Sequence, residues 1–395
     1  MYDQLKLNVS DKRRSNPFTW RGQFTPELID YLLDTHYKKG DLVADPFSGS
    51  GTVLLESIRR NVDAVGCEVN PSAYAMSKFF ELATRTFPER WNLSQELVRN
   101  VPLPGNLMAR PVYDASEKDY RKAYASLIYF AKRAIDSHTN KQELVLLLNI
   151  LFRMESCNKL NIGQAWNKSY NEITEFLYSL PETSAHITAC LTDARLLDKH
   201  VSRPVGLTIT SPPYINVFNY HQNHRIIMEL LDFDILDVAR SEFGSNRKNR
   251  GNRFFTVIQY CIDMAQALSS IQRASSNDGT IIMVVGRESN VRKTAFYNGD
   301  IVCDLALHSK LFSLKHRAER VFQNKFGTDI IEDVLVFSPF SSVSKLDDIA
   351  REVSAMHLQK AMLSVPNEAR DDLRAAINSI DKIEASPIFH YKNNK

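Results

Sequence analysis

Short apolar runs and amphipathic segments alternate near the start of the chain. Residues 26–39 have helical periodicity, with Pro26 at a favourable first-turn position and Gly40 as a stop signal. An apolar strand at 42–44 follows, then a glycine-containing loop and another helix. Residues 63–70 have the composition of a second buried strand. This order predicts a βαβ unit, the opening of an α/β, doubly wound, mostly parallel sheet.

The alternation stops after the second strand. Helical patterns dominate 81–185, interrupted by a Pro- and Gly-containing stretch at 101–111, so we expect a helical insertion in the sheet. A strong amphipathic helix is predicted over 255–274. Short apolar runs with β-branched residues predict that the sheet resumes at 187–197, 205–214, 279–286 and 332–339.

These patterns predict four regions. Residues 1–80 and 186–340 form the two parts of a catalytic domain, and 81–185 form an insertion that is a candidate target-recognition lobe. Residues 341–395 form a charged, helical C-terminal appendage, which we expect to be peripheral.

Composition narrows the class of protein. A hydrophobic fraction of 44% supports a sizeable core, and a net charge of +3 does not identify a nucleic-acid binder by itself. Five scattered cysteines without a CxxC pair favour reduced thiols over a disulfide framework or a metal site. The sequence shows no secretion signal and no membrane-spanning run, so we expect a cytoplasmic protein without metal.

A glycine loop follows the first strand. In DPFSGSGT (45–52), Gly49 and Gly51 allow a tight turn and close approach of a ligand, and Thr52 opens the next helix. Glu68 ends the next strand, where a carboxylate can accept hydrogen bonds from a ribose diol. Asp193 ends a later strand, where it could bind an adenine amino group. The loop matches neither GxGxxG nor a P-loop, which disfavours a phosphate-bearing cofactor. The alternative is that the glycines serve only the turn.

The segment TSPPY (210–214) is the most informative stretch. Pro212 and Pro213 stiffen the chain and leave carbonyl oxygens exposed. Ser211 Oγ and the Pro212 carbonyl can accept the hydrogens of a base amino group and align its nitrogen with a methyl donor. Tyr214 offers a face on which a flipped base can stack. The alternative is a proline-rich turn with Tyr214 as a packing residue. His221 and His224 are interpreted as polar or structural.

Two basic segments are candidate phosphate contacts. The first lies at 244–253 and includes Arg247, Lys248, Arg250 and Arg253; the second lies at 315–325. For both, the alternative is a solvated charged loop.

These motifs resemble those of the DNA amino-methyltransferases, which modify N6 of adenine or N4 of cytosine. DPFSGSGT resembles their S-adenosylmethionine loop, TSPPY their catalytic tetrapeptide, RGQFTPEL (21–28) the segment that covers the methionine end of the cofactor, and GCEVNP (66–71) the ribose-binding strand end. The resemblance covers about half the chain, in residues 20–80 and 188–340. It implies a Rossmann-like class I methyltransferase fold.

The resemblance also implies site residues. The catalytic set is Ser211, Pro212, Pro213 and Tyr214. The cofactor set is Phe24, Thr25, Pro26, Asp45, Phe47, Gly49, Gly51, Thr52, Glu68, Asn70, Asp193 and Ala194.

Serine at the first tetrapeptide position is more typical of cytosine-N4 enzymes, whereas Asp or Asn is more typical of adenine-N6 enzymes. No Pro-Cys occurs, which excludes the usual cytosine-C5 chemistry. The resemblance implies double-stranded DNA as substrate, base flipping, and a restriction–modification setting with a cognate endonuclease. An RNA methyltransferase and a catalytically silent DNA-binding subunit remain alternatives. The cofactor loop precedes the catalytic loop, one of the family's permuted orders, and the insertion is not a standard part.

Overall fold

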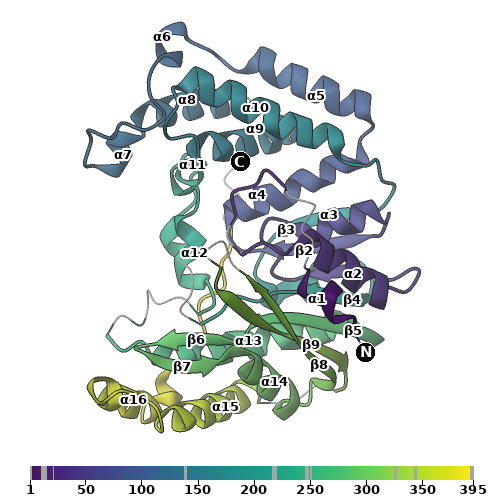
Figure 1. Cartoon of the computed structure of the whole chain (residues 1–395), viewed down its shortest axis with the longest axis vertical. Coiled ribbons are helices and arrows are strands. Elements are labelled where there is room, and N and C mark those ends of the chain that lie inside the picture. Colours follow the sequence, from purple (N-terminus) through teal and green to yellow (C-terminus); the bar gives the residue numbers. More distant parts are fainter. Residues whose placement is uncertain are drawn as a thin grey trace.

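A central sheet organises the chain (Figure 1). The computed structural model describes residues 2–9, 16–20, 22–137, 140–215, 220–244, 249, 251–323, 327–341 and 345–391. Within them, the strands of this sheet are β1 (Val43–Asp45), β2 (Ala64–Glu68), β3 (Ile187–Leu191), β4 (Val205–Thr210), β5 (Ser275–Gly286), β8 (Phe312–Gln323) and β9 (Asp329–Pro339).

The strand order is β3-β2-β1-β4-β5-β9-β8. Strands β1 to β5 pair with one another in parallel. Strand β9 runs antiparallel to both β5 and β8. The predicted Rossmann-like, doubly wound, mostly parallel sheet is therefore confirmed. The chain leaves β1 toward one edge and returns to β4 on the other side of β1, so the order reverses between these two strands.

Alternating side chains of the strands enter two separate cores. Val43 belongs to the core on one face, whereas Leu42 and Ala44 belong to the core on the other. Both faces are apolar because helices cover both of them, as parallel sheets require. One face carries α1 (Gln4–Asn8), α2 (Pro26–His36), α3 (Thr52–Arg59) and α4 (Pro71–Phe79); the other carries α13 (Phe255–Ala274), α14 (Asn298–His308), α15 (Leu346–Ala361) and α16 (Arg370–Ile377).

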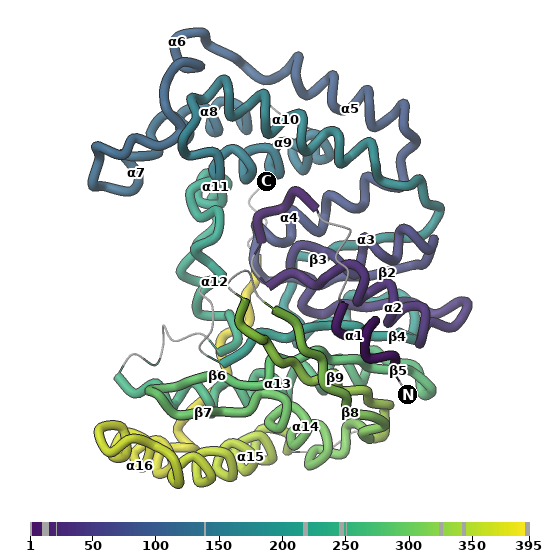
Figure 2. The backbone as a smooth tube through the Cα atoms, viewed as in Figure 1, coloured from purple at the N-terminus to yellow at the C-terminus, as the bar shows by residue number. Residues whose placement is uncertain are grey.

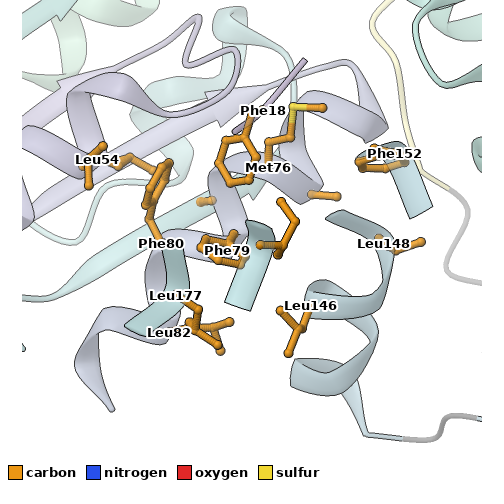
Figure 3. Close-up of a cluster of buried hydrophobic side chains, with 14 of the residues drawn as sticks. Phe18, Leu54, Met76, Phe79, Phe80, Leu82, Leu146, Leu148, Phe152 and Leu177 are labelled. Carbon is orange, nitrogen blue, oxygen red and sulfur yellow. The ribbon is translucent and has the colours of Figure 1, made fainter. Parts of the chain in front are cut away.

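The region between β2 and β3 is helical beyond α4. Its core is continuous with that of the first sheet face, as Figure 3 shows for the cluster around Phe79 and Phe80. The Phe79 ring stacks on Phe176 with centroids 5.9 Å apart, and Asn149 Nδ2 donates a 3.0 Å hydrogen bond to the Ala75 carbonyl. The helices are α5 (Phe87–Asn100), α6 (Gly105–Met108), α7 (Tyr120–Ala123), α8 (Ala125–Asp136), α9 (Lys141–Glu155) and α10 (Ile162–Ser179).

Two short helices, α11 (Arg225–Glu229) and α12 (Ile235–Ser241), separate β4 from α13. The predicted helix over 255–274 coincides with α13. Both tail helices are present, and α15 packs on α13 through buried residues, so the tail is more than peripheral. After α16 the chain turns back along α13 toward α12 (Figure 2). Near α12, Tyr391 stacks on Phe233 with ring centroids 4.8 Å apart.

Among the described strands, three had no counterpart in the sequence prediction. Two form the hairpin of β6 (Glu288–Val291) and β7 (Thr294–Tyr297), and the third is the edge strand β8. The basic segment at 315–325, as far as it is described, lies in β8 and is not a loop. Its Arg317 pairs with Asp300 and Asp333, and Arg320 pairs with Glu332. Because an edge strand is only partly buried, its charged sequence lacks the apolar run that identified the inner strands.

We expect Gly51→Ala to destabilise the fold more than Gly40→Ala. Both glycines have positive φ, at +86° and +94°, so both variants incur a backbone cost of about 1 kcal/mol. Only at Gly51 would the added Cβ lie 2.8 Å from Phe80 Cδ2, which should add roughly 1–3 kcal/mol. Urea unfolding of the two variants measures the difference. Equal losses would contradict this packing argument.

Candidate active site

A pocket opens at the carboxyl ends of the parallel strands, where the strand order reverses between β1 and β4. Ligands bind at such switch points in open α/β sheets. The loops after β1, β2, β3 and β4 contribute to its wall, together with a segment before α2 and one after α12. The lining residues are Trp20, Gly22, Gln23, Phe24, Pro46, Phe47, Ser48, Gly49, Ser50, Thr52, Glu68, Val69, Asn70, Asp193, Ala194, Ser211, Pro213, Tyr220, Glu242 and Phe243.

The structure brings most of the predicted site residues together in this pocket. From the cofactor set, the wall contains Phe24, Phe47, Gly49, Thr52, Glu68, Asn70, Asp193 and Ala194; from the catalytic set it contains Ser211 and Pro213. The remaining predicted residues, which do not line it, are Thr25, Pro26, Asp45, Gly51, Pro212 and Tyr214.

Glu68 shapes the glycine loop. Its Oε2 accepts a 2.8 Å hydrogen bond from the Gly49 backbone N–H, and its Oε1 accepts one of 2.8 Å from Asn70 N–H. On the other side of the loop, Ser77 Oγ donates to the Gly49 carbonyl at 2.7 Å. Each carboxylate oxygen has a second lone pair, so Glu68 can hold the loop and still accept a ligand hydroxyl.

Burial raises the pKa of Glu68 to about 7, and the nearby carboxylates of Asp45 and Glu242 raise it as well. The two backbone hydrogen bonds act in the opposite direction. Glu68 therefore changes charge near neutral pH.

Asp45 connects the glycine loop (45–52) to the TSPPY loop (210–214). It is buried, and its Oδ1 accepts hydrogen bonds from Thr210 Oγ1 at 2.6 Å and from Phe47 N–H at 3.1 Å. Burial raises its pKa to about 7, opposed by these two hydrogen bonds. Since Thr210 directly precedes Ser211, this carboxylate holds the loops after β1 and β4 side by side and acts as a positioning residue.

The catalytic loop follows β4 without a helical turn. Tyr214 Oη lies 3.3 Å from Ser211 Oγ and donates to Glu332 Oε1 at 3.2 Å. The Tyr214 ring lies against Gly286, where an added Cβ would be 2.5 Å from Cε2. Burial, and secondarily the Glu332 carboxylate, raise the pKa of Tyr214 well above its ordinary value, so its hydroxyl stays protonated. Glu332 and Gly286 thus fix the tyrosine beside Ser211.

Asp193 lies in the pocket wall but is also part of a buried ion cluster. Its Oδ2 accepts a 2.6 Å hydrogen bond from Arg195 Nη2, and its Oδ1 accepts one of 2.9 Å from Arg195 Nε. Arg195 Nη1 lies 3.4 Å from Asp263 and donates to the Ser386 carbonyl at 2.7 Å. The adenine contact of Asp193 stays a prediction, and the C-terminal segment supports this side of the pocket.

Four wall residues, Trp20, Tyr220, Glu242 and Phe243, lie outside the motifs that predicted the site. Trp20 stacks on Tyr220 with centroids 5.5 Å apart, and Phe47 meets Phe243 edge-on at 5.4 Å. Glu242 joins them from the segment after α12. Trp20 adjoins the segment 21–28 and could have been found by extending that motif, whereas the other three lie in no motif.

Of the four expected phosphate contacts, only Arg253 lies among the described residues. Arg247, Lys248 and Arg250 lie outside the described residues. Arg253 is exposed just before α13. In the described part of the chain, no cluster of His, Cys, Asp and Glu side chains is arranged to hold a metal ion. None of the helices described has the length and apolar character needed to span a membrane.

Comparisons with known proteins agree with the motifs. Residues 2–79 match the family model described as DNA methylase. Over 161 residues the chain is 24% identical to the Type II methyltransferase M.MjaII of Methanocaldococcus jannaschii. The matched region covers 38% of this chain and 30% of that protein. The chain thus covers less than two thirds of that relative. These matches confirm the resemblance to DNA amino-methyltransferases and support S-adenosylmethionine as the cofactor.

The solved structures found by comparison include methyltransferases, at low sequence identity and low TM-score. TrmN from Thermus thermophilus is 14% identical, with a TM-score of 0.34, over 81% of this chain and 50% of that chain. A SAM-dependent methyltransferase from Methanosarcina mazei is 9% identical, with a TM-score of 0.34, over 78% and 97%. The rRNA methyltransferase aviRa from Streptomyces viridochromogenes is 12% identical, with a TM-score of 0.31, over 82% and 88%. We draw no substrate from these likenesses.

The pocket's side chains fit S-adenosylmethionine. Phe47, Phe243 and Ala194 provide apolar surface for an adenine ring, and Glu68 provides acceptors for a ribose. The acceptor Glu242 Oε1 is buried without a hydrogen-bond partner among the described residues, as expected of a group that a ligand satisfies.

We expect Glu68→Gln to weaken cofactor binding about tenfold or more, because the amide cannot accept from both backbone N–H groups and lacks the negative charge. In the unaltered protein, affinity should fall as the pH drops through about 7, where Glu68 gains a proton. The variant should lose this component, and any remaining pH dependence would report the other carboxylates with a raised pKa at the pocket, Asp45 and Glu242. Calorimetric titration measures both effects. A range of roughly pH 6–8.5 brackets the two pKa values of about 7.

The matched control is Asp278→Asn, which removes a carboxylate with 80% of its side chain exposed at the start of β5. It should leave the dissociation constant unchanged. A Glu68→Gln protein with unaltered affinity would contradict the ribose assignment.

Proposed function

We propose that the chain is an S-adenosylmethionine-dependent methyltransferase that modifies an exocyclic amino group of a base in DNA, with N4 of cytosine favoured. One observation carries the proposal: Ser211 of the catalytic loop and Gly49 of the cofactor loop line the same pocket. The Asp45–Thr210 hydrogen bond holds these loops together. A methyl donor on one loop can therefore reach an amine on the other.

The bound cofactor supplies an electrophilic methyl group on a sulfonium. Ser211 Oγ and the Pro212 carbonyl accept the hydrogens of the base amino group, which aligns the nitrogen lone pair with that methyl. When bound, the cofactor would give up its methyl group to that nitrogen and leave as a neutral thioether, and the displaced amino proton would pass to solvent. The protein carries no covalent intermediate in this scheme. Tyr214, fixed by Glu332 and Gly286, lies beside Ser211, and the part of this partly buried side chain that the protein leaves uncovered is the proposed stacking surface for the base.

The recessed position of Ser211 supports base flipping. Its side chain lines a pocket at the strand ends, which a base within a stacked duplex cannot enter. The target base would therefore leave the helix, at a cost of a few kcal/mol. Double-stranded DNA is the proposed partner, with Arg253 and the basic residues before it as phosphate contacts. A cognate restriction endonuclease is part of the proposed setting.

The choice of N4 of cytosine rests on serine at position 211. N6 of adenine in DNA is the second candidate because the same loop geometry accepts either amino group. Methylation of RNA and a silent DNA-binding subunit are the remaining alternatives.

Nucleoside mass spectrometry tests the proposal. DNA from cells that express the chain, in a host without endogenous amino-methylation, should contain 4-methylcytosine. Appearance of 6-methyladenine alone would reverse the base assignment, and modified nucleosides only in RNA would overturn the DNA substrate. Absence of modification together with no affinity for S-adenosylmethionine would identify a silent subunit.

We expect Tyr214→Ala to lower turnover on DNA by roughly 5- to 150-fold, the effect of losing one base-stacking contact. Tyr214→Phe keeps the ring against Gly286 and should lose less. Cofactor affinity should change less than turnover in both, since Tyr214 does not line the cofactor pocket. Steady-state kinetics and calorimetry separate the two effects. Unchanged turnover in Tyr214→Ala would count against its role.

A further inference from the structure

Glu242 is a pocket carboxylate that no motif of the chain explains. It follows α12 and is only 7% exposed, yet it lines the pocket. Its Oε2 lies 2.7 Å from His221 Nδ1, and His221 is itself 1% exposed. Its other oxygen, Oε1, has no hydrogen-bond partner among the described residues. One half of this carboxylate is fixed by the protein and the other half is left to accept.

Glu242 lies close to Glu68, the predicted ribose ligand, in the wall of the same pocket. It is near enough to Glu68 for its charge to raise the pKa of that carboxyl. The pKa of the Tyr220 hydroxyl is raised by burial and, in addition, by both carboxylates. Asn70 also lines the pocket; it is the N-cap of α4, two residues after Glu68 at the end of β2. The Ser211 loop lines the pocket from β4, whereas Glu68 and Asn70 follow β2.

Glu242 is buried and Glu68 partly buried, and two such carboxylates in one pocket are costly unless donors or positive charge meet them. Burial raises the pKa of Glu242, and hydrogen bonds with His221 and with the Asn70 side chain oppose this rise. Arg195 does not compensate them, because its guanidinium bonds to Asp193 and to the C-terminal segment. A ligand with two adjacent hydroxyl donors and a net positive charge meets both requirements.

We infer that Glu242 is a second ribose-binding carboxylate, which accepts a hydrogen bond from one hydroxyl of the cofactor diol while Glu68 accepts from the other. His221 is a positioning residue that holds Oε2 and thereby directs Oε1 into the pocket. This inference rests on the proposed cofactor. It assigns a cofactor contact to the segment between the catalytic loop and α13.

The test pairs side-chain variants with deleted hydroxyls. S-adenosylhomocysteine and its 2′-deoxy and 3′-deoxy analogues are titrated calorimetrically into the full chain, so the readout does not depend on turnover. The unaltered protein should bind both deoxy analogues about tenfold more weakly than the parent, the loss expected for a hydrogen bond to a charged acceptor. Glu242→Gln should bind the parent more weakly and become insensitive to removal of one hydroxyl. Glu68→Gln should become insensitive to removal of the other.

Controls separate contact from folding. Asp237→Asn alters a half-exposed carboxylate on α12 and should behave as the unaltered protein. Thermal unfolding checks each variant; if Glu242→Gln is unstable, His221→Gln, which can still donate a hydrogen bond, should retain more of the hydroxyl sensitivity than His221→Phe. Full sensitivity to both hydroxyls in Glu242→Gln would overturn this inference alone. No binding of S-adenosylhomocysteine by the unaltered protein would overturn the proposed function with it.

Discussion

The candidate site depends on one buried hydrogen bond between neighbouring strands. Thr210 Oγ1 donates to Asp45 at the point where β1 and β4 diverge, and each residue begins a loop that supplies one side of the pocket. Parallel pairing aligns the strands only up to their ends. Beyond those ends, the side-chain bond keeps the glycine loop and the double-proline loop in register. Glu68 does the same between the glycine loop and the strand end of β2.

The fold and the centre of the site could be predicted from local sequence. The inner strands are buried on both faces, so their apolar runs are legible, and α13 was predicted with its observed bounds. Glu68, Asp193 and Ser211 were placed together because parallel strands end at one edge of a sheet. The glycine and proline loops carry backbone requirements that only a few residue types satisfy.

The rest of the site is created by tertiary packing and leaves no local pattern. Glu242 and Phe243 reach the pocket through the folding of α11 and α12, and Arg195 donates hydrogen bonds to backbone carbonyls of the distant tail. Strand β8 was hidden because its charges pair with β9 and α14 and so resemble a solvated loop. Each of these features depends on partners far away in the sequence.

The charges of the pocket bear on the two ligands proposed for it, the cofactor and the target base. Asp45, Glu68, Asp193 and Glu242 place carboxylates in or directly behind the wall, and Arg195 is already bonded to one of them. Such a wall repels phosphates but suits a cofactor whose sulfonium and ammonium outweigh its carboxylate. If the proposed substrate is correct, a nucleic-acid backbone would be held outside the pocket and the uncharged base alone would enter. The acidic interior is thus compatible with the proposed base flipping, because it would admit the base and repel the phosphates of the strand that carries it.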